Sequence, residues 1–342
     1  MNFFDSFPKC YLIAEIGVNH NGNLELAKKM IFEAKKAGAN AVKFQTFTAT
    51  SLVSENTPKV AYQIDTTSPD QSHFEMIKEL ELSKENHIAL FDYCKSLDIE
   101  FLSTPYDVES ANFLIDLGVN LFKTASADII DYHLHEFIAS TGKPTLIATG
   151  MASLLEIEKV LEIYKSKNND NILLLHCVSN YPCSDYSINL RAMKKLKDIF
   201  NIPVGYSDHS IGSLAASLSI AFGAKVIEKH FTLDKSLSGP DHKASSTPEE
   251  FKELVDNVKR AETILGNNQK IRQQEEEQMA LVSRKSIFLK YELNEGHILK
   301  KEDLKLLRPG DGISPLFLSE IMGRKVNKKL PVNHKLLWSD LE

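Results

Sequence analysis

The chain has few cysteines and no long apolar segment. Only four cysteines occur in 342 residues, and they form no Cys-x-x-Cys pair. This excludes the disulfide framework of small secreted domains and the paired-cysteine zinc sites, so we expect reduced thiols. No apolar run approaches the roughly 20 residues of a membrane-spanning helix, and no basic leader precedes an apolar core at the N-terminus. These absences predict a cytoplasmic protein that does not bind membranes.

A strong excess of positive charge is also missing. The chain has 40 Lys and Arg against 46 Asp and Glu, a formal net charge of −6. This balance provides no general attraction to nucleic acid or to an anionic membrane, so neither is an expected partner. An anionic ligand must therefore be bound by particular basic side chains.

Short apolar runs alternate regularly with longer helix-like segments. Continuous apolarity is typical of strands buried on both faces, and the segments between the runs are long enough for crossover helices. In the first such segment, Asn23 is placed to cap a helix and Gly38 to end it. Eight units ending near residue 266 predict an α/β fold, a (β/α)₈ TIM barrel over residues 1–266. The eight runs are "YLIAEIG", "AVKFQTF", "EFLSTP", "LFKTAS", "PTLIATG", "NILLLHC", "PVGYSD" and "VIEKHFT".

Two regions break this alternation. Residues 47–84 lengthen the connection after the second strand, and a long insertion at a barrel mouth either covers a ligand or is a passive surface excursion. Residues 267–282 are polar and rich in charge, and strand-like and turn-like segments follow them. We therefore predict a linker at 267–282 and a small C-terminal domain at 283–342.

Two lysines follow predicted strands at the end of the barrel where active sites lie. Lys43 and Lys123 emerge from nearly continuous apolar runs, where an unpaired ammonium group is costly. With the hydroxyls of Ser126 and Thr149, they are suited to bind a phosphate and a carboxylate. The alternative is that they form salt bridges with Glu15 or Glu228 inside the barrel.

Two histidines follow the last two predicted strands. His209 and His230 stand 21 residues apart, about one helix with its turns, so neighbouring strands can direct both imidazoles to one point. Two such ligands suit a divalent metal with positions left for water and substrate. The alternative is a pair of core histidines that bind backbone groups. Asp208 is a candidate to orient a histidine, and Asp241 is a candidate ligand or acceptor near the metal.

Several motifs in order resemble the sialic acid synthase family, which makes N-acetylneuraminic, legionaminic or pseudaminic acid. They are "AEIGVNHNG", "AVKFQTF", "FLSTP", "ATGMAS", "LLHCVSNYP", "VGYSDHS", "VIEKHFTLDKSLSGPDHKAS" and "LRPGDGISP". The resemblance covers essentially the whole chain. It implies a catalytic barrel followed by a SAF domain, similar to type III antifreeze proteins, at residues 283–342.

The resemblance also implies a role for each matching residue. Glu15, Lys43 and Lys123 match catalytic positions, and His209 and His230 match ligands of a divalent metal, with Mn²⁺ expected and Mg²⁺ or Co²⁺ as alternatives. Arg308 matches an arginine that one subunit inserts into its partner's active site, which implies a domain-swapped homodimer. The implied phosphoenolpyruvate-binding residues are Lys43, Thr104, Lys123, Ser126, Thr149 and Ser207, and the implied sugar-binding residues are Gln45, Tyr181, Asp241 and Arg308.

The implied reaction joins phosphoenolpyruvate, an N-acylated hexose and water, and releases phosphate. Two candidate sugars are N-acetylmannosamine, which gives N-acetylneuraminate, and 2,4-diacetamido-2,4,6-trideoxymannose, which gives legionaminate. The segment "KTASADI" departs from the family pattern because Asp128 replaces a longer acid. Alternatives are a pseudaminate synthase, a 3-deoxy-aldulosonate-phosphate synthase, a metal-dependent barrel hydrolase or lyase, and a non-catalytic carbohydrate-binding protein.

Overall fold

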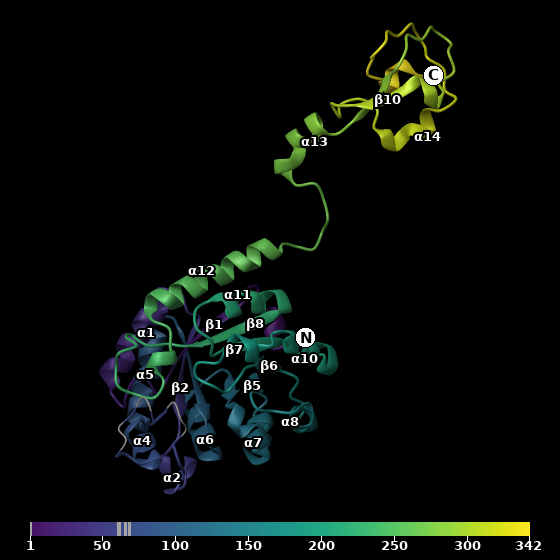
Figure 1. The fold of residues 1–342 in the computed structure, drawn as a ribbon. Helices are drawn as coiled ribbons and strands as arrows, with labels where there is room; N and C mark the ends of the chain where they lie inside the picture. Colours follow the sequence, from purple (N-terminus) through teal and green to yellow (C-terminus); the bar gives the residue numbers. More distant parts are fainter. Residues whose placement is uncertain (1, 60–62, 65–66, 68–69) are drawn as a thin grey trace. The chain divides into compact units, whose positions relative to one another are not determined.

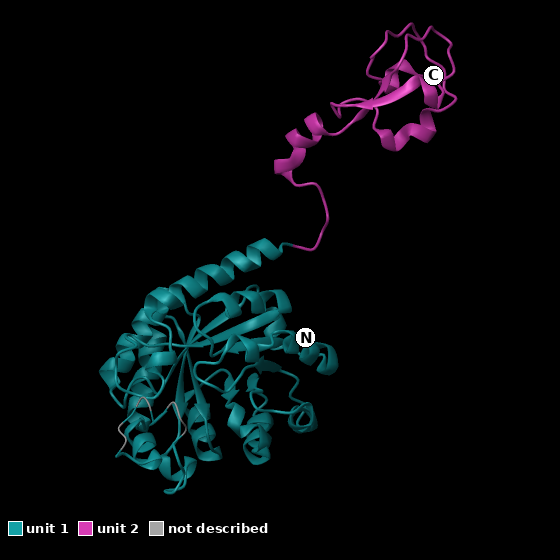
Figure 2. Cartoon of the chain, in the orientation of Figure 1, with its two compact units in different colours: residues 1–266 teal, residues 267–342 magenta. Residues whose placement is uncertain are grey.

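The computed structural model describes residues 2–59, 63–64, 67 and 70–342. The chain divides into two compact units, residues 1–266 and 267–342, coloured teal and magenta in Figure 2. Each unit has a hydrophobic core of its own. None of the described helices has the length and apolarity needed to span a membrane.

Unit 1 is the predicted barrel (Figure 1). Seven of the eight apolar runs contain a whole strand, and the eighth contains all but the first two residues of the last strand. All neighbouring strands in the ladder are parallel, in the order β3-β2-β1-β8-β7-β6-β5-β4. Strands β3 and β4 lie side by side and complete the ring. The strands are β1 Tyr11–Gly17, β2 Ala41–Thr46, β3 Glu100–Pro105, β4 Phe122–Thr124, β5 Thr145–Ala148, β6 Ile172–His176, β7 Val204–Asp208 and β8 Ala224–His230.

Helices surround the strands, and the first one shows how the sequence sets their ends. The Asn23 side chain accepts hydrogen bonds from the backbone N–H groups of Glu25 and Leu26, and Gly38 ends the helix with a φ of 101°. Both ends agree with the prediction. The α-helices are α1 Leu24–Ala37, α2 Ala49–Leu52, α4 His73–Glu79, α5 Lys84–Ser96, α6 Val108–Leu117, α7 Tyr132–Ser140, α8 Leu154–Ser166, α9 Asp185–Ile188, α10 Arg191–Phe200, α11 Leu214–Ser219 and α12 Pro248–Leu265.

The barrel interior is apolar at one end and polar at the other. Alternate residues of each strand face inward, so the positions before the polar residues form an apolar layer. This layer is closed by the 3₁₀ helix η1 (Phe3–Ser6), whose Phe4 is fully buried. The opposite end is thus left for the polar side chains. Inward apolar residues include Ile13, Ala41, Leu102, Leu121, Leu146, Leu173, Leu175 and Val226.

Unit 2 is a small domain of short elements around a separate apolar core. Its strands β9 and β10 pair antiparallel. The predicted linker, 267–282, contains η5 and most of α13. The elements are η5 Gln274–Glu276, α13 Glu277–Ser283, β9 Ser286–Leu289, η6 Lys301–Asp303, β10 Leu304–Leu307, η7 Pro315–Phe317, α14 Leu318–Ile321 and η8 Trp338–Asp340.

Unit 2 contains an internal repeat with an offset of 37 residues, in which residues 286–305 correspond to 323–342. In the first copy Asp303 accepts hydrogen bonds from His297 Nε2 and from the backbone N–H of Lys300, both at 2.9 Å. In the second copy Asp340 accepts from His334 Nε2 at 2.8 Å and from a backbone N–H at 2.9 Å. The two copies meet where Leu293 and Leu330 exchange backbone hydrogen bonds.

Candidate active site

Strand register brings the inward polar residues of neighbouring strands together. Glu15 of β1 lies beside Lys43 of β2 on one side and His230 of β8 on the other. On β7, Ser207 lies beside Glu228 of β8. Because these positions share the inward parity of their strands, their side chains converge at the polar end of the barrel.

Two carboxylates and two ammonium groups form a buried cluster there. Lys43 Nζ lies 2.6 Å from Glu15 Oε2 and 3.7 Å from Glu228 Oε2, and it donates to Thr104 Oγ1 at 3.0 Å. Lys123 Nζ lies 3.4 Å from Glu228 Oε1. Glu15, Lys43 and Glu228 are at most 2% exposed, so these charges interact with little screening by water. In this ligand-free structure the lysines therefore make the salt bridges expected as the alternative to anion binding.

The two carboxyl groups of the cluster have opposite protonation preferences. Burial raises the pKa of Glu15 to about 7, although Lys43 opposes the rise. The pKa of Glu228 is held low because both lysines lie close to it and outweigh the effect of its burial. Such a pair provides one permanent anion and one group that exchanges a proton near neutral pH.

The two histidines have lone pairs available for a metal. His209 Nδ1 lies 2.6 Å from the carbonyl oxygen of Val178, which only accepts, so Nδ1 carries the proton and Nε2 the lone pair. Nδ1 of His230 is buried without a hydrogen-bond partner, 3.7 Å from Asp241 Oδ2. The pKa of both imidazoles is lowered, chiefly by burial, which keeps them neutral. Their ring centroids are 5.5 Å apart, with the Tyr181 ring 4.2 Å from that of His209.

This donor set fits a metal with two protein ligands and open positions for water and substrate. Ser207 Oγ donates to Glu228 Oε1 at 3.1 Å, so its single proton is not directed at His209 Nε2, 3.3 Å away. Over the described ranges, no group of three or more His, Cys, Asp and Glu side chains is arranged to hold a metal ion.

A cavity of about 420 Å³ unites most of the predicted site residues. Thr149 and Arg308 are not among its lining residues: the Thr149 hydroxyl donates to the carbonyl of Leu175, and Arg308 belongs to unit 2. Ser126 Oγ accepts the N–H of Gly150 at 3.0 Å, and a Cβ at Gly150 would lie 2.3 Å from Ser179 Oγ. The predicted residues that line the cavity are Glu15, Lys43, Gln45, Thr104, Lys123, Ser126, Tyr181, Ser207, His209, His230 and Asp241.

Two residues have different roles from those expected. Glu228 had been considered only as a salt-bridge partner, but it contacts both lysines and Ser207 and lines the cavity. The sequence signal for this role is that Glu228 lies two residues before His230, so both side chains face the barrel interior. Asp208 does not orient His209: it points outward from β7, binds Lys229 Nζ at 2.9 Å and accepts hydrogen bonds from Ser210.

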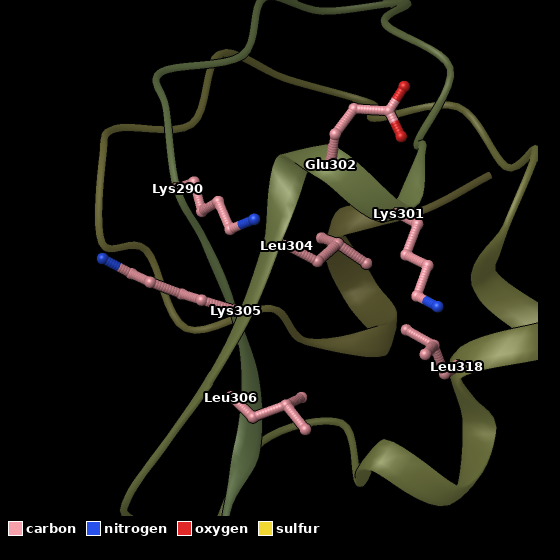
Figure 3. A pocket seen from close by; sticks show the side chains of 7 residues that line it. All are labelled: Lys290, Lys301, Glu302, Leu304, Lys305, Leu306 and Leu318. Carbon is pink, nitrogen blue, oxygen red and sulfur yellow. The ribbon is translucent and has the colours of Figure 1, made fainter.

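A second hollow of about 440 Å³ lies on unit 2. Figure 3 shows Lys290 and Lys301 on either side of Leu304. The charged residues that line it, which also include Glu302 and Lys305, are exposed or half-exposed. The hollow therefore lacks the buried, desolvated charges of the barrel cavity.

Comparison with known proteins identifies the chain. Residues 30–270 match the NeuB family, and residues 284–342 match the SAF domain. The chain belongs to the NeuB family. The predicted family and fold class, a barrel followed by a SAF domain, are therefore confirmed.

Relatives in the NeuB family align over almost the full chain. The chain is 46% identical to the N,N'-diacetyllegionaminic acid synthase of Legionella pneumophila, covering 97% of this chain and 95% of that protein. It is 37% identical to a pseudaminic acid synthase of Campylobacter jejuni, covering 98% of each. Among solved structures, the N-acetylneuraminic acid (sialic acid) synthetase of Leptospira borgpetersenii is 36% identical, with a TM-score of 0.70 over 79% of this chain and 90% of that chain.

Proposed function

We propose that this protein condenses phosphoenolpyruvate with an N-acylated hexose and water to form a nonulosonic acid and phosphate. The observation that carries the proposal is one cavity with two buried lysines, two carboxyls of opposite protonation preference and two neutral imidazoles. The relatives of this chain include synthases named for legionaminic, pseudaminic and N-acetylneuraminic acids, which supports this reaction class.

Phosphoenolpyruvate binds at the lysine side of the cavity. Lys43 and Lys123 neutralise its phosphate and carboxylate, and the hydroxyls of Thr104, Ser126 and Ser207 donate hydrogen bonds to them. Thr149 completes this set if its hydroxyl turns from the Leu175 carbonyl toward the anion. The close approach of Gly150 to Ser126 keeps the backbone near the anion without side-chain obstruction.

His209 and His230 would hold a divalent metal, with Mn²⁺ as the first choice and Mg²⁺ or Co²⁺ as alternatives. When bound there, such an ion would supply Lewis acidity at the aldehyde oxygen of the open-chain sugar, which would make C1 more electrophilic. The Val178 carbonyl fixes the orientation of the His209 ring, and Asp241 lies beside His230.

Glu15 manages the proton of the attacking water. The carbon–carbon double bond of phosphoenolpyruvate opens as its methylene carbon bonds to C1 of the sugar, and the aldehyde oxygen takes up a proton from the solvent. Water then adds to the former enol carbon, and Glu15 accepts the proton that this water loses. The resulting tetrahedral carbon releases phosphate by cleavage of its carbon–oxygen bond, and its hydroxyl proton passes to the departing phosphate, which leaves a keto group. Lys43 and Lys123 stabilise the departing charge, and a pKa of about 7 suits Glu15 to this proton transfer.

The sugar contacts Gln45, Tyr181 and Asp241, and a second copy of the chain supplies Arg308 in a domain-swapped homodimer. Charge supports this pairing. Residues 267–342 contain 14 Lys and Arg against 11 Asp and Glu, whereas residues 1–266 contain 26 against 35. A net positive unit is therefore attracted to the net negative barrel of a partner chain.

The function is tested by a mass-spectrometric product assay. The protein is incubated with Mn²⁺, phosphoenolpyruvate and N-acetylmannosamine or 2,4-diacetamido-2,4,6-trideoxymannose, and phosphate release is measured in parallel. We expect an acid with a nine-carbon backbone whose mass equals that of the sugar plus pyruvic acid, with one phosphate released per product. Phosphate release without a sugar would indicate a hydrolase, a product only from a phosphorylated aldose would indicate an aldulosonate-phosphate synthase, and the absence of any turnover would indicate a binding protein.

The lysines provide a prediction about substrate binding. Lys43→Met and Lys123→Met each remove a charge-assisted contact worth about 1.5–3 kcal/mol, so we expect KM for phosphoenolpyruvate to rise by about 10- to 150-fold. KM for the sugar should change much less. The control is Lys84→Met, because Lys84 does not line the cavity and its ammonium group pairs at the surface with Glu109 and lies over the Phe113 ring. Equal rises in both KM values would favour a purely structural salt bridge.

A further inference from the structure

A buried ion pair lies on the outer side of the barrel, directly before the two candidate metal ligands in the chain. Asp208 and Lys229 stand opposite each other in the register of β7 and β8, and they form the last pair of that ladder. His209 and His230 are the residues that follow them. Because adjacent residues of a strand point to opposite faces, Asp208 and Lys229 face away from the cavity, and neither lines it.

The ion pair also binds the backbone beyond His209. Asp208 Oδ1 accepts hydrogen bonds from the N–H and the hydroxyl of Ser210, at 2.9 and 2.6 Å. Lys229 Nζ lies 2.9 Å from Asp208 Oδ2 and donates a second hydrogen bond to the Ser210 carbonyl. The bond from Asp208 to the N–H two residues later closes an Asx-turn with His209 at its centre. Both neighbours of His209 are therefore bonded to the residue that precedes His230.

Stability alone is a weak reason for this arrangement. Asp208, Ser210 and Lys229 are at most 2% exposed, so both charges have lost their contact with water. The cost of this desolvation offsets much of their attraction, and a well-packed uncharged pair of similar volume is often at least as stable. A polar network in which the groups are hydrogen-bonded does, however, hold its members in one arrangement.

The spacing of the two imidazoles is a property that such a network can fix. Asp208 makes no contact with the His209 ring, whose orientation is set by the Val178 carbonyl. The backbone ladder between β7 and β8 ends before the two histidines, so it does not extend to them. Metal–nitrogen bonds are about 2 Å long, and one ion is bound well by two imidazoles only if their separation matches this length.

We propose that Asp208 and Lys229 are positioning residues whose ion pair holds the ends of β7 and β8 at the spacing at which His209 and His230 bind one divalent ion. This inference rests on the proposed function, and it concerns two residues that touch neither substrate nor metal. Groups that support metal ligands in this way contribute about 10- to 100-fold in metal affinity.

The test measures Mn²⁺ binding by calorimetry, with and without saturating phosphoenolpyruvate, together with thermal unfolding. The variant is the double change Asp208→Asn with Lys229→Met, which removes both charges at nearly constant volume and leaves no unpaired charge buried. We expect it to unfold at a similar temperature to the unaltered protein and to bind Mn²⁺ about 10- to 100-fold more weakly. Binding of phosphoenolpyruvate without metal should be retained, because Lys43 and Lys123 lie on β2 and β4.

Two further variants show whether the effect belongs to this network. Ser210→Ala removes one hydroxyl and keeps the ion pair, so it should weaken Mn²⁺ binding less than the double change. The matched control is Lys235→Met, because Lys235 lies shortly after β8, pairs with Glu250 at 2.6 Å and does not line the cavity. It should leave Mn²⁺ affinity unchanged.

The outcomes separate this inference from the proposed function. If the unaltered protein forms no product in the assay above, the proposed function is wrong. If it binds no Mn²⁺, the proposed metal site is wrong and this inference fails with it. If it binds Mn²⁺ and the double variant binds equally well, only the positioning role is overturned. A double variant that fails to fold, or an equal loss of affinity in Lys235→Met, also overturns that role, because the ion pair then serves the general stability of the barrel.

Discussion

Replacement of His209 or His230 by alanine is expected to lower phosphate release by more than about 100-fold. Loss of groups that merely support a metal ligand already costs 10- to 100-fold, and each of these changes removes one of only two proposed protein ligands. The fold should remain intact, because both rings line the cavity at the polar end of the barrel, above the apolar layer of its interior. The measurement is phosphate release at saturating Mn²⁺, together with metal binding by calorimetry.

His133→Ala is the matched control, because His133 is exposed on α7. It should leave turnover and metal binding unchanged. Treatment of the unaltered protein with a chelator should reproduce the loss, and added Mn²⁺ should restore activity. Full turnover by a rigorously metal-free preparation, without stimulation by added Mn²⁺, would refute the metal assignment.

Two inactive variants should restore activity when they form mixed dimers. Glu15→Gln removes the proposed proton acceptor in the barrel, and Arg308→Ala removes the proposed contact from the partner's SAF domain. If each site combines one barrel with the partner's arginine, a hybrid dimer contains one intact site. Random exchange of equal amounts makes about half of the dimers hybrid, so we expect about a quarter of the unaltered activity.

Subunit exchange has to be demonstrated in the same mixture, for example with two affinity tags and native mass spectrometry. Mixing two Glu15→Gln preparations serves as the control and should give no activity. Verified hybrid dimers without recovered turnover would show that Arg308 does not complete the site across a dimer. A monomeric Arg308→Ala chain that is as active as the unaltered protein would also show that Arg308 does not complete the site across a dimer.

The sequence predicted the strands of the barrel because each is a continuous apolar run followed by a polar residue. The position of Lys43, Lys123, His209 and His230 at one end follows from this pattern alone, since parallel strands end together. The barrel could therefore be predicted without knowing which side chains contact one another.

Side-chain partnerships were harder to predict, because they depend on which strands are neighbours and on which face each residue lies. Glu228 becomes central only when β8 is placed beside both β7 and β1. Asp208 faces away from His209 because adjacent residues of a strand point to opposite faces. The bond between Thr149 and the Leu175 carbonyl likewise depends on the local turn after β5.

The repeat in unit 2 has the form that tandem duplication of a half-domain leaves. Both copies have leucines, a histidine and an aspartate at matching positions. The same turn therefore occurs twice, closed by the hydrogen bond from His297 to Asp303 in one copy and from His334 to Asp340 in the other. Residues 306–322 join the two copies and have no matching segment in the repeat. Within this segment, the backbone of Ile313 forms hydrogen bonds with Ile287 of the first copy and with Leu336 of the second. Arg308 lies in this joining segment. The task proposed for Arg308 therefore falls to the joining segment, which has no repeat partner, while the repeated parts form the scaffold around it.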